Sequence, residues 1–171
     1  NTPWYQGPAL MEYLETVPVD DEIQRAPFRM PVQWVNRPNL DFRGFSGRVA
    51  GGVVRPGDRI RVLPSGTESV VTRIVTKDGD REEAVAGQSI TLTLADEIDI
   101  SRGDVIAPAS APPAVADQFE ATIVWMHEEE MLPGRRYLMK IGSKTVGVTM
   151  VTPKYKVNVN TLEHLAAKRL E

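Results

Sequence analysis

The sequence contains no cysteine and two histidines, His127 and His164. Without cysteine the chain cannot form a disulfide, a thiolate nucleophile or a Cys-ligated metal site. The two histidines lie far apart, so a histidine-based zinc site would need carboxylate ligands as well and is not expected. The absence of cysteine leaves the redox compartment open, and a reducing cytoplasm is compatible with it.

Long apolar runs and a strong charge of one sign are also missing. No apolar stretch approaches the roughly 20 residues that span a bilayer, and the N-terminus lacks the basic start of a signal peptide. The formal net charge is -3, which gives no electrostatic reason to expect nucleic acid or an anionic membrane as a partner. Because the chain begins at Asn1 rather than at methionine, we expect it to be a segment of a longer protein.

Motifs for nucleotide binding are absent too. A phosphate-binding loop needs Gly, four residues and then Gly-Lys-Ser/Thr, and the nearest approach is Gly142-Ser143-Lys144-Thr145, in which a serine separates Gly from Lys. The upstream glycine would fall at Leu138, so a hairpin turn is the better interpretation. An Asn-Lys-x-Asp motif for guanine recognition does not occur either.

What the sequence does contain is a series of short strands. Apolar and polar residues alternate from Phe28 to Trp34, with Pro31 indicating an edge or an irregularity in that strand. Turn sequences rich in Gly, Pro and Asp then separate the next apolar runs, a pattern typical of a closed barrel. The further strands predicted up to Pro108 lie at residues 46–54, 58–63, 69–76, 88–94 and 104–107.

Helices are predicted at both ends of the chain. Leu10, Met11 and Leu14 have helical spacing, and Asn160 is a suitable N-cap for an apolar stripe that ends at Leu170. The predicted domains are a linker and helix (1–25), a β-barrel (26–110), an Ala- and Pro-rich linker (111–117) and a partial second β unit with a terminal helix (118–171). Further strands are predicted within this unit at residues 118–126, 137–141, 145–151 and 154–159.

Clusters of titratable residues offer weak candidates for a site. Asp96, Glu97 and Asp99 could hold a hard cation, but a solvated acidic loop is the favoured interpretation. His127 has no Ser or Cys nucleophile paired with it in a recognisable pattern. The three tryptophans are expected in the core or at domain contacts, and they are Trp4, Trp34 and Trp125.

Four motifs, in their order along the chain, resemble the second domain of translational GTPases. The hairpin motif Gly47-Arg48-Val49-Ala50-Gly51-Gly52-Val53-Val54-Arg55-Pro56-Gly57-Asp58 is the longest of them. This resemblance implies an all-β fold: a barrel like elongation factor Tu domain II, a partial barrel like domain III, and short helices at both ends. The other three motifs are Ala26–Val32, Ala84–Ile90 and Ile100–Ile106.

Further segments resemble the large subunit of bacterial sulfate adenylyltransferase (ATP sulfurylase). The loop from Asn36 to Gly44 is the main discriminator, because translation factors usually lack it in this form. The remaining matching segments are Trp4–Pro8 with Leu14–Glu15, Gln33–Asn36, Leu92–Asp99 and Asn158–His164.

The resemblance implies a role as well as a fold. The parent would be a cytoplasmic enzyme of sulfate assimilation that couples GTP hydrolysis to the formation of adenylyl sulfate and pyrophosphate from ATP and sulfate. GTP and Mg would bind in a preceding GTPase domain, so no catalytic, cofactor or metal residue carries over to this chain. The implied partners are the small catalytic subunit, the parent's own GTPase domain and, in some members, an adenylylsulfate kinase domain.

The Asn36–Gly44 loop is the candidate interface, because a long loop on a barrel is a suitable contact surface. A loop that merely caps the barrel is an equally good interpretation of the same residues. The alternative function for the whole chain is a translation-factor barrel that binds a ribonucleoprotein. The candidate interface residues are Arg37, Asn39, Asp41, Phe42 and Arg43.

Overall fold

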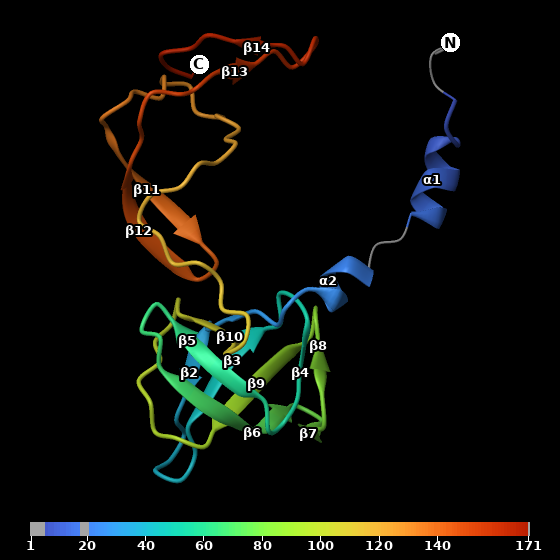
Figure 1. Ribbon diagram of the computed structural model, residues 1–171, viewed down its shortest axis with the longest axis vertical. Coiled ribbons are helices and arrows are strands. Elements are labelled where there is room, and N and C mark those ends of the chain that lie inside the picture. The colour runs from blue at the N-terminus through green and yellow to red at the C-terminus, as the bar shows by residue number, and fades with distance from the viewer. Residues whose placement is uncertain (1–5, 18–20, 171) are drawn as a thin grey trace.

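The computed structural model describes residues 6–17 and 21–170. Two short helices, α1 (Leu10–Thr16) and α2 (Asp21–Arg25), precede a β-barrel, and a smaller β unit lies beyond it (Figure 1). The first helix confirms the N-terminal prediction. It buries none of its residues, so its apolar side chains face solvent here. The predicted position of Trp4 lies outside the described residues.

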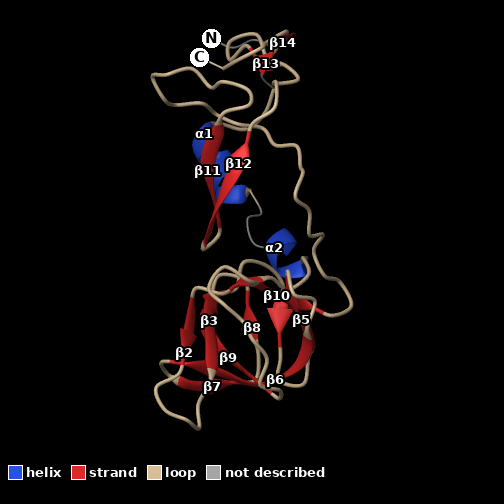
Figure 2. Cartoon of the chain, turned by 90° about the vertical axis from the view of Figure 1, so that its left-hand side faces the viewer, coloured by secondary structure: helices blue, strands red, loops and turns tan. Residues whose placement is uncertain are grey.

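The barrel is built from antiparallel pairs in the order β1-β10-β5-β6-β9-β3-β2, with β7 paired to β6. Figure 2 shows most of these strands around the barrel. A small separate pair, β4 with β8, lies beside this sheet. The predicted all-β barrel is therefore confirmed, as are its turns. The strands are β1 (Met30–Pro31), β2 (Trp34–Asn36), β3 (Gly44–Arg48), β4 (Val53–Val54), β5 (Arg59–Leu63), β6 (Glu68–Thr76), β7 (Gly79–Arg81), β8 (Ala84–Val85), β9 (Ser89–Leu94) and β10 (Val105–Pro108).

The barrel closes where its first strand changes partner. As far as Val32 the first strand pairs with β10, and the Val32 amide donates a hydrogen bond to the Asp104 carbonyl, which directly precedes β10, at 2.8 Å. One residue later the Gln33 amide donates to the Ser46 carbonyl of β3, also at 2.8 Å. The irregularity predicted from Pro31 is thus real, because one strand split in two joins both edges of the sheet.

Two turns of the barrel use the same chemistry. In Arg55–Asp58 and in Ser101–Asp104 the aspartate side chain accepts a hydrogen bond from the amide of the first turn residue, at 2.7 and 2.8 Å. The glycine before each aspartate has φ of +93° and +97°, a conformation that a residue without Cβ adopts readily. The Arg102-Gly103-Asp104 tripeptide therefore makes the turn into β10.

One apolar core fills the barrel. It includes Phe28, Phe45, Ile74 and Leu92, each less than 4% exposed. These side chains come from β3, β6, β9 and the approach to β1, and along β6 buried and accessible positions alternate over much of the strand. Burial of this apolar surface is the main source of the barrel's stability.

The second unit has a much smaller interior. It contains the hairpin of β11 (Arg136–Ile141) with β12 (Lys144–Thr149), and the pair of β13 (Lys156–Val157) with β14 (His164–Leu165). Met131, which bridges to Leu170, is buried. In the same unit the Trp125 ring meets the Tyr137 ring edge-on at 5.6 Å.

Two predictions for this second unit are wrong. Residues 118–126 form no strand, because in the part of the chain that the structure describes no strand pairs with them. The terminal helix is also absent: residues 159–161 form a turn and His164–Leu165 a short strand. The Asn158 side chain accepts hydrogen bonds from the amides of Asn160 and Thr161, which holds a turn where an N-cap was predicted.

Candidate protein interface

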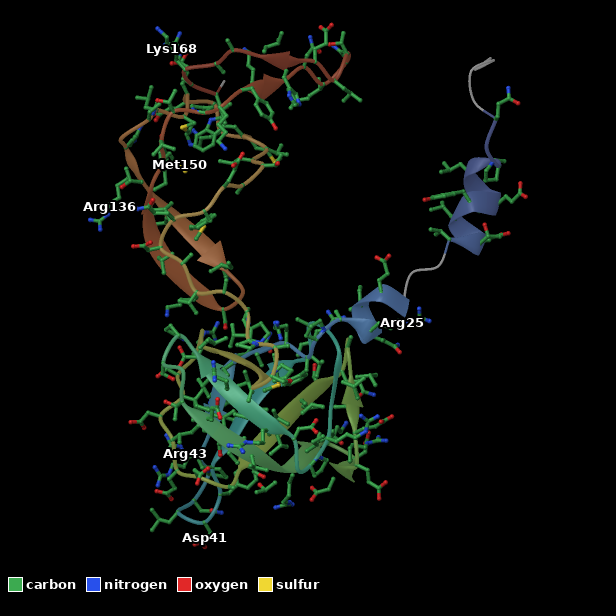
Figure 3. The ribbon with its side chains drawn as sticks, in the orientation of Figure 1. Arg25, Asp41, Arg43, Arg136, Met150 and Lys168 are labelled. Atoms are coloured by element: carbon green, nitrogen blue, oxygen red, sulfur yellow. The ribbon has the colours of Figure 1, made fainter. Side chains whose placement is uncertain are left out.

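The predicted interface loop connects β2 to β3 and projects from the barrel. Asn36 pairs with Gly44 at the base of this hairpin. Asp41 lies near the tip, at the end of the barrel away from the second unit, and Arg43 lies closer to the strands (Figure 3). The structure therefore brings all five predicted residues into one projecting loop.

The tip of the loop is accessible. Arg37, Asn39 and Asp41 are exposed, and Leu40 between them is 87% exposed. The Asn39 side chain accepts a hydrogen bond from the Asp41 amide at 3.0 Å, and this local turn orders the tip. The ordered tip consequently exposes the apolar side chain of Leu40 between the opposite charges of Arg37 and Asp41.

The two remaining predicted residues anchor the loop. Phe42 is half-buried and lies over Gly44, where a Cβ atom would come within 2.8 Å of the Phe42 ring. The Arg43 guanidinium lies 5.7 Å from the centre of the Phe45 ring and 3.2 Å from the Asp99 carboxylate. The loop thus combines the two predicted roles. Phe42 and Arg43 cap the barrel, and the exposed tip is available as a contact surface.

Sequence reasoning missed Trp34 as a surface residue. It was predicted in the core or at a domain contact, but its side chain on β2 is 61% exposed, so it does not belong to the core. The alternation from Phe28 placed Trp34 on the core face with Val32, but the strand changes partner after Val32. Val35 packs against the core beyond that point, so its neighbour Trp34 faces outward. An exposed tryptophan next to the loop adds to the candidate interface, because aromatic side chains are enriched in protein contacts.

The acidic loop predicted from Asp96 to Asp99 is engaged in internal contacts. Asp96 accepts a hydrogen bond from the Ser69 hydroxyl at 2.8 Å, and Asp99 pairs with Arg43. No group of three or more His, Cys, Asp or Glu side chains suited to a metal occurs in residues 6–17 and 21–170. Within this charged loop Asp96 is therefore held by the barrel, whereas the Asp99 side chain stays fully exposed in its ion pair.

The segment that resembles part of a phosphate-binding loop is a hairpin turn. Gly142 and Ser143 connect β11 to β12, and Ile141 pairs with Lys144. The predicted turn is confirmed. Within the described residues no helix is long and apolar enough to cross a membrane.

Two ion pairs on the barrel change the pKa values of their carboxylates. The hydrogen bond from Arg61 is the main reason that the pKa of Glu68 is lowered, and the charges of Arg61 and Arg59 act in the same direction. The hydrogen bond from Arg73 likewise lowers the pKa of Asp80. Lowered carboxyl pKa values keep these groups charged, so they serve as ion-pair partners rather than as proton donors near neutral pH.

Comparison with family models divides the chain into two matching regions. Residues 45–107 match the model of elongation factor Tu domain 2. Residues 118–171 match the model described as GTP-eEF1A C-terminal domain-like. Both parts of the fold are therefore of translational-GTPase type.

Full-length relatives narrow the family further. The chain is 52% identical over 167 residues to sulfate adenylyltransferase subunit 1 of Aeromonas salmonicida (strain A449), a match that covers 98% of the chain and 36% of that protein. The chain belongs to the sulfate adenylyltransferase large-subunit family. It is also 53% identical over 168 residues to the bifunctional enzyme CysN/CysC of Xylella fastidiosa (strain Temecula1 / ATCC 700964), covering 98% of the chain and 27% of that enzyme. The chain thus spans about a quarter to a third of these sulfate adenylyltransferase relatives.

Solved structures support the same fold. The chain superimposes on sup35 complexed with GDP with a TM-score of 0.72 at 21% identity, covering 98% of this chain and 42% of that one. It superimposes on translation elongation factor SelB of Methanococcus maripaludis with the same TM-score of 0.72 at 19% identity, covering 94% of this chain and 35% of that one. At these identities the likeness shows that a sulfate adenylyltransferase family member and translation factors share a fold.

Proposed function

We propose that this chain is the non-catalytic barrel region of the large, GTP-hydrolysing subunit of sulfate adenylyltransferase. The observation that supports this most is the identity of about 50% to subunit 1 proteins over 98% of the chain. The parent would take part in the reaction of ATP with sulfate to give adenylyl sulfate and pyrophosphate, in the cytoplasm. Because formation of adenylyl sulfate is unfavourable, coupling to GTP hydrolysis gives the reaction a driving force.

In this proposal GTP and Mg bind in a GTPase domain outside the chain, and the small subunit supplies the adenylyl-transfer site. The barrel packs between them and transmits the nucleotide-dependent rearrangement, which requires different barrel contacts in the GTP and GDP states. Where the parent is fused to an adenylylsulfate kinase, as the name CysN/CysC of one relative suggests, the kinase is a further neighbour.

The β2–β3 loop is the proposed contact with the small subunit. Its tip combines Leu40 with the charges of Arg37 and Asp41, all exposed, and Trp34 is exposed on the adjoining strand. Apolar and aromatic residues flanked by charges are the composition that protein interfaces favour. The anchored base, with Phe42 over Gly44, reduces the entropy lost when the tip is bound.

Calorimetric titration of the purified chain with the small subunit tests the proposal. We expect saturable binding that Arg37→Glu weakens about tenfold, equivalent to about 1.4 kcal/mol. Lys168→Glu, an exposed charge reversal in the second unit at the end of the molecule opposite Asp41 (Figure 3), is the matched control and should leave the affinity unchanged. Absence of binding would remove the docking role. Binding to ribosomes in its place would favour the translation-factor alternative.

A further inference from the structure

The second β unit meets the barrel at one well-defined place. The turn of the β11–β12 hairpin points toward the barrel in both views (Figures 1 and 2). There the Ser143 hydroxyl donates a hydrogen bond to the Val32 carbonyl oxygen at 2.6 Å, across 111 residues of sequence. The contact is partly buried, so water competes for it less than at an exposed site.

Val32 is the residue at which the barrel closes. Its carbonyl oxygen also accepts a hydrogen bond from the Gly103 amide at 2.9 Å, and a carbonyl oxygen has two lone pairs for two such donors. One oxygen thus connects three segments: the split first strand, the turn into β10, and the hairpin of the second unit. The hairpin turn therefore contacts the barrel at its seam, the place where the first strand changes partner from β10 to β3.

The contact requires the β11–β12 turn to approach the backbone at Gly103 closely. A Cβ atom on Gly103 would lie 2.9 Å from the Cβ atom of Lys144, closer than such atoms pack, whereas one on Gly142 would lie 3.6 Å from that of Pro31. Gly103 therefore leaves the space that the turn occupies. Its φ of +97° is a second reason for glycine at this position.

We infer that the contact of Ser143 with the barrel seam, in the space left by Gly103, is a joint that fixes the second unit on the barrel. Ser143 is its positioning residue: the hydroxyl selects the docked orientation over others that the linker of residues 111–117 permits. The joint lies at the other end of the barrel from the β2–β3 loop (Figure 3), and it stands whether or not the small subunit binds.

Distance measurement between two spin labels tests the joint. The chain has no cysteine, so Glu97→Cys on the barrel and Thr149→Cys on the hairpin, both exposed, place the labels uniquely. We expect a narrow distance distribution in the parent chain. Ser143→Ala should raise the population outside the main peak about fivefold, the effect of losing one hydrogen bond. Ser143→Thr, which keeps the hydroxyl, should restore the narrow distribution.

Gly103→Ala tests whether the space next to Lys144 is needed for the joint, and Gly79→Ala is its matched control. Both glycines have positive φ, +97° and +108°, but a Cβ atom on Gly79 meets nothing within 4 Å. Only Gly103→Ala should broaden the distribution. A broad distribution in the parent chain, or a narrow one in both Ser143→Ala and Gly103→Ala, would overturn the joint. Broadening in Gly103→Ala alone would overturn the role of Ser143.

Discussion

Arg43 and Asp99 join two loops that lie 56 residues apart, with 3.2 Å between Arg43 Nη2 and Asp99 Oδ1. The two ends of this ion pair are unequal: the Arg43 side chain is 24% exposed and that of Asp99 fully exposed. Arg43 also lies over the Phe45 ring. The guanidinium thus contributes through packing as well as charge.

This inequality predicts unequal mutant effects. Arg43→Ala should lower the free energy of unfolding by about 1 kcal/mol, because it removes the contact with Phe45 together with the ion pair. Asp99→Ala should have no measurable effect, because a solvent-exposed pair contributes little. Urea unfolding of both variants measures the difference. Equal losses would mean that the ion pair, and not the stacking, anchors the loop.

Ser69 is a buried polar residue of the barrel, 4% exposed, and its hydroxyl donates to Asp96 at 2.8 Å. Ser69→Ala should lower the free energy of unfolding by about 1.5 kcal/mol, since a hydrogen bond to a charged group is lost. Thr72→Ala is the control: its hydroxyl also bonds a partner, Thr93, but at an exposed site, and should cost less than about 0.5 kcal/mol. Chemical unfolding compares the two, and similar losses would contradict the role of burial.

The two β units should respond differently to removal of apolar side chains. Phe45 is 2% exposed in the barrel core, and Phe45→Ala should lower the free energy of unfolding by about 4 kcal/mol. Leu138, on the hairpin, is 82% exposed, and Leu138→Ala should change it by less than about 0.5 kcal/mol. Calorimetric unfolding measures both. A large loss in Leu138→Ala would show that this face is covered in solution.

The barrel could be predicted from sequence because its signals are local. Gly57 and Gly103 stand in turns that need positive φ, and the aspartate after each supplies the hydrogen bond that holds the turn. Alternation then assigns a face to most residues between turns. Trp34 is an exception, because the strand changes partner after Val32. The loop at Asn36–Gly44 was located instead from its resemblance to sulfate adenylyltransferase large subunits. Its division into an exposed tip and an anchored base depends in part on Asp99, which pairs with Arg43 from 56 residues further along the chain.

The two predictions that failed in the second unit did so for different reasons. Residues 118–126 alternate like a strand, but a strand also needs a neighbour to satisfy its amides, and no pattern within the segment states whether one exists. At the C-terminus the apolar spacing from Leu162 to Leu170 fits a helix. The competing hydrogen bonds of Asn158 are equally local, and they determine the observed turn.

Protonation of Asp80 should affect barrel stability in acid. The hydrogen bond and charge of Arg73 lower its pKa in the folded state below the ordinary value of 3.8. A lowered folded pKa stabilises the fold above the ordinary value, and the contribution is lost as pH falls through the lowered one. The difference in unfolding free energy between the parent chain and Asp80→Asn should therefore be present at pH 6 and shrink at pH values below 3.8. A difference independent of pH would contradict this assignment.

Leu162 decides between the observed turn and the helix that its sequence pattern predicts. Its φ is +60°, a left-handed conformation that is costly for a residue with Cβ, and its side chain is 73% exposed. Leu162→Gly should therefore stabilise the turn by about 0.5–1 kcal/mol. In a helix the same substitution would destabilise by about 0.8 kcal/mol.

Hydrogen exchange of the Asn158 amide measures this effect, because that amide donates to the Glu163 carbonyl at 2.9 Å across the turn. We expect slower exchange in Leu162→Gly, by a factor of about two to five. Leu165→Gly, a glycine placed in β14 where no positive φ is required, is the control and should speed exchange. Faster exchange in both variants would mean that Leu162 does not adopt the left-handed conformation in solution.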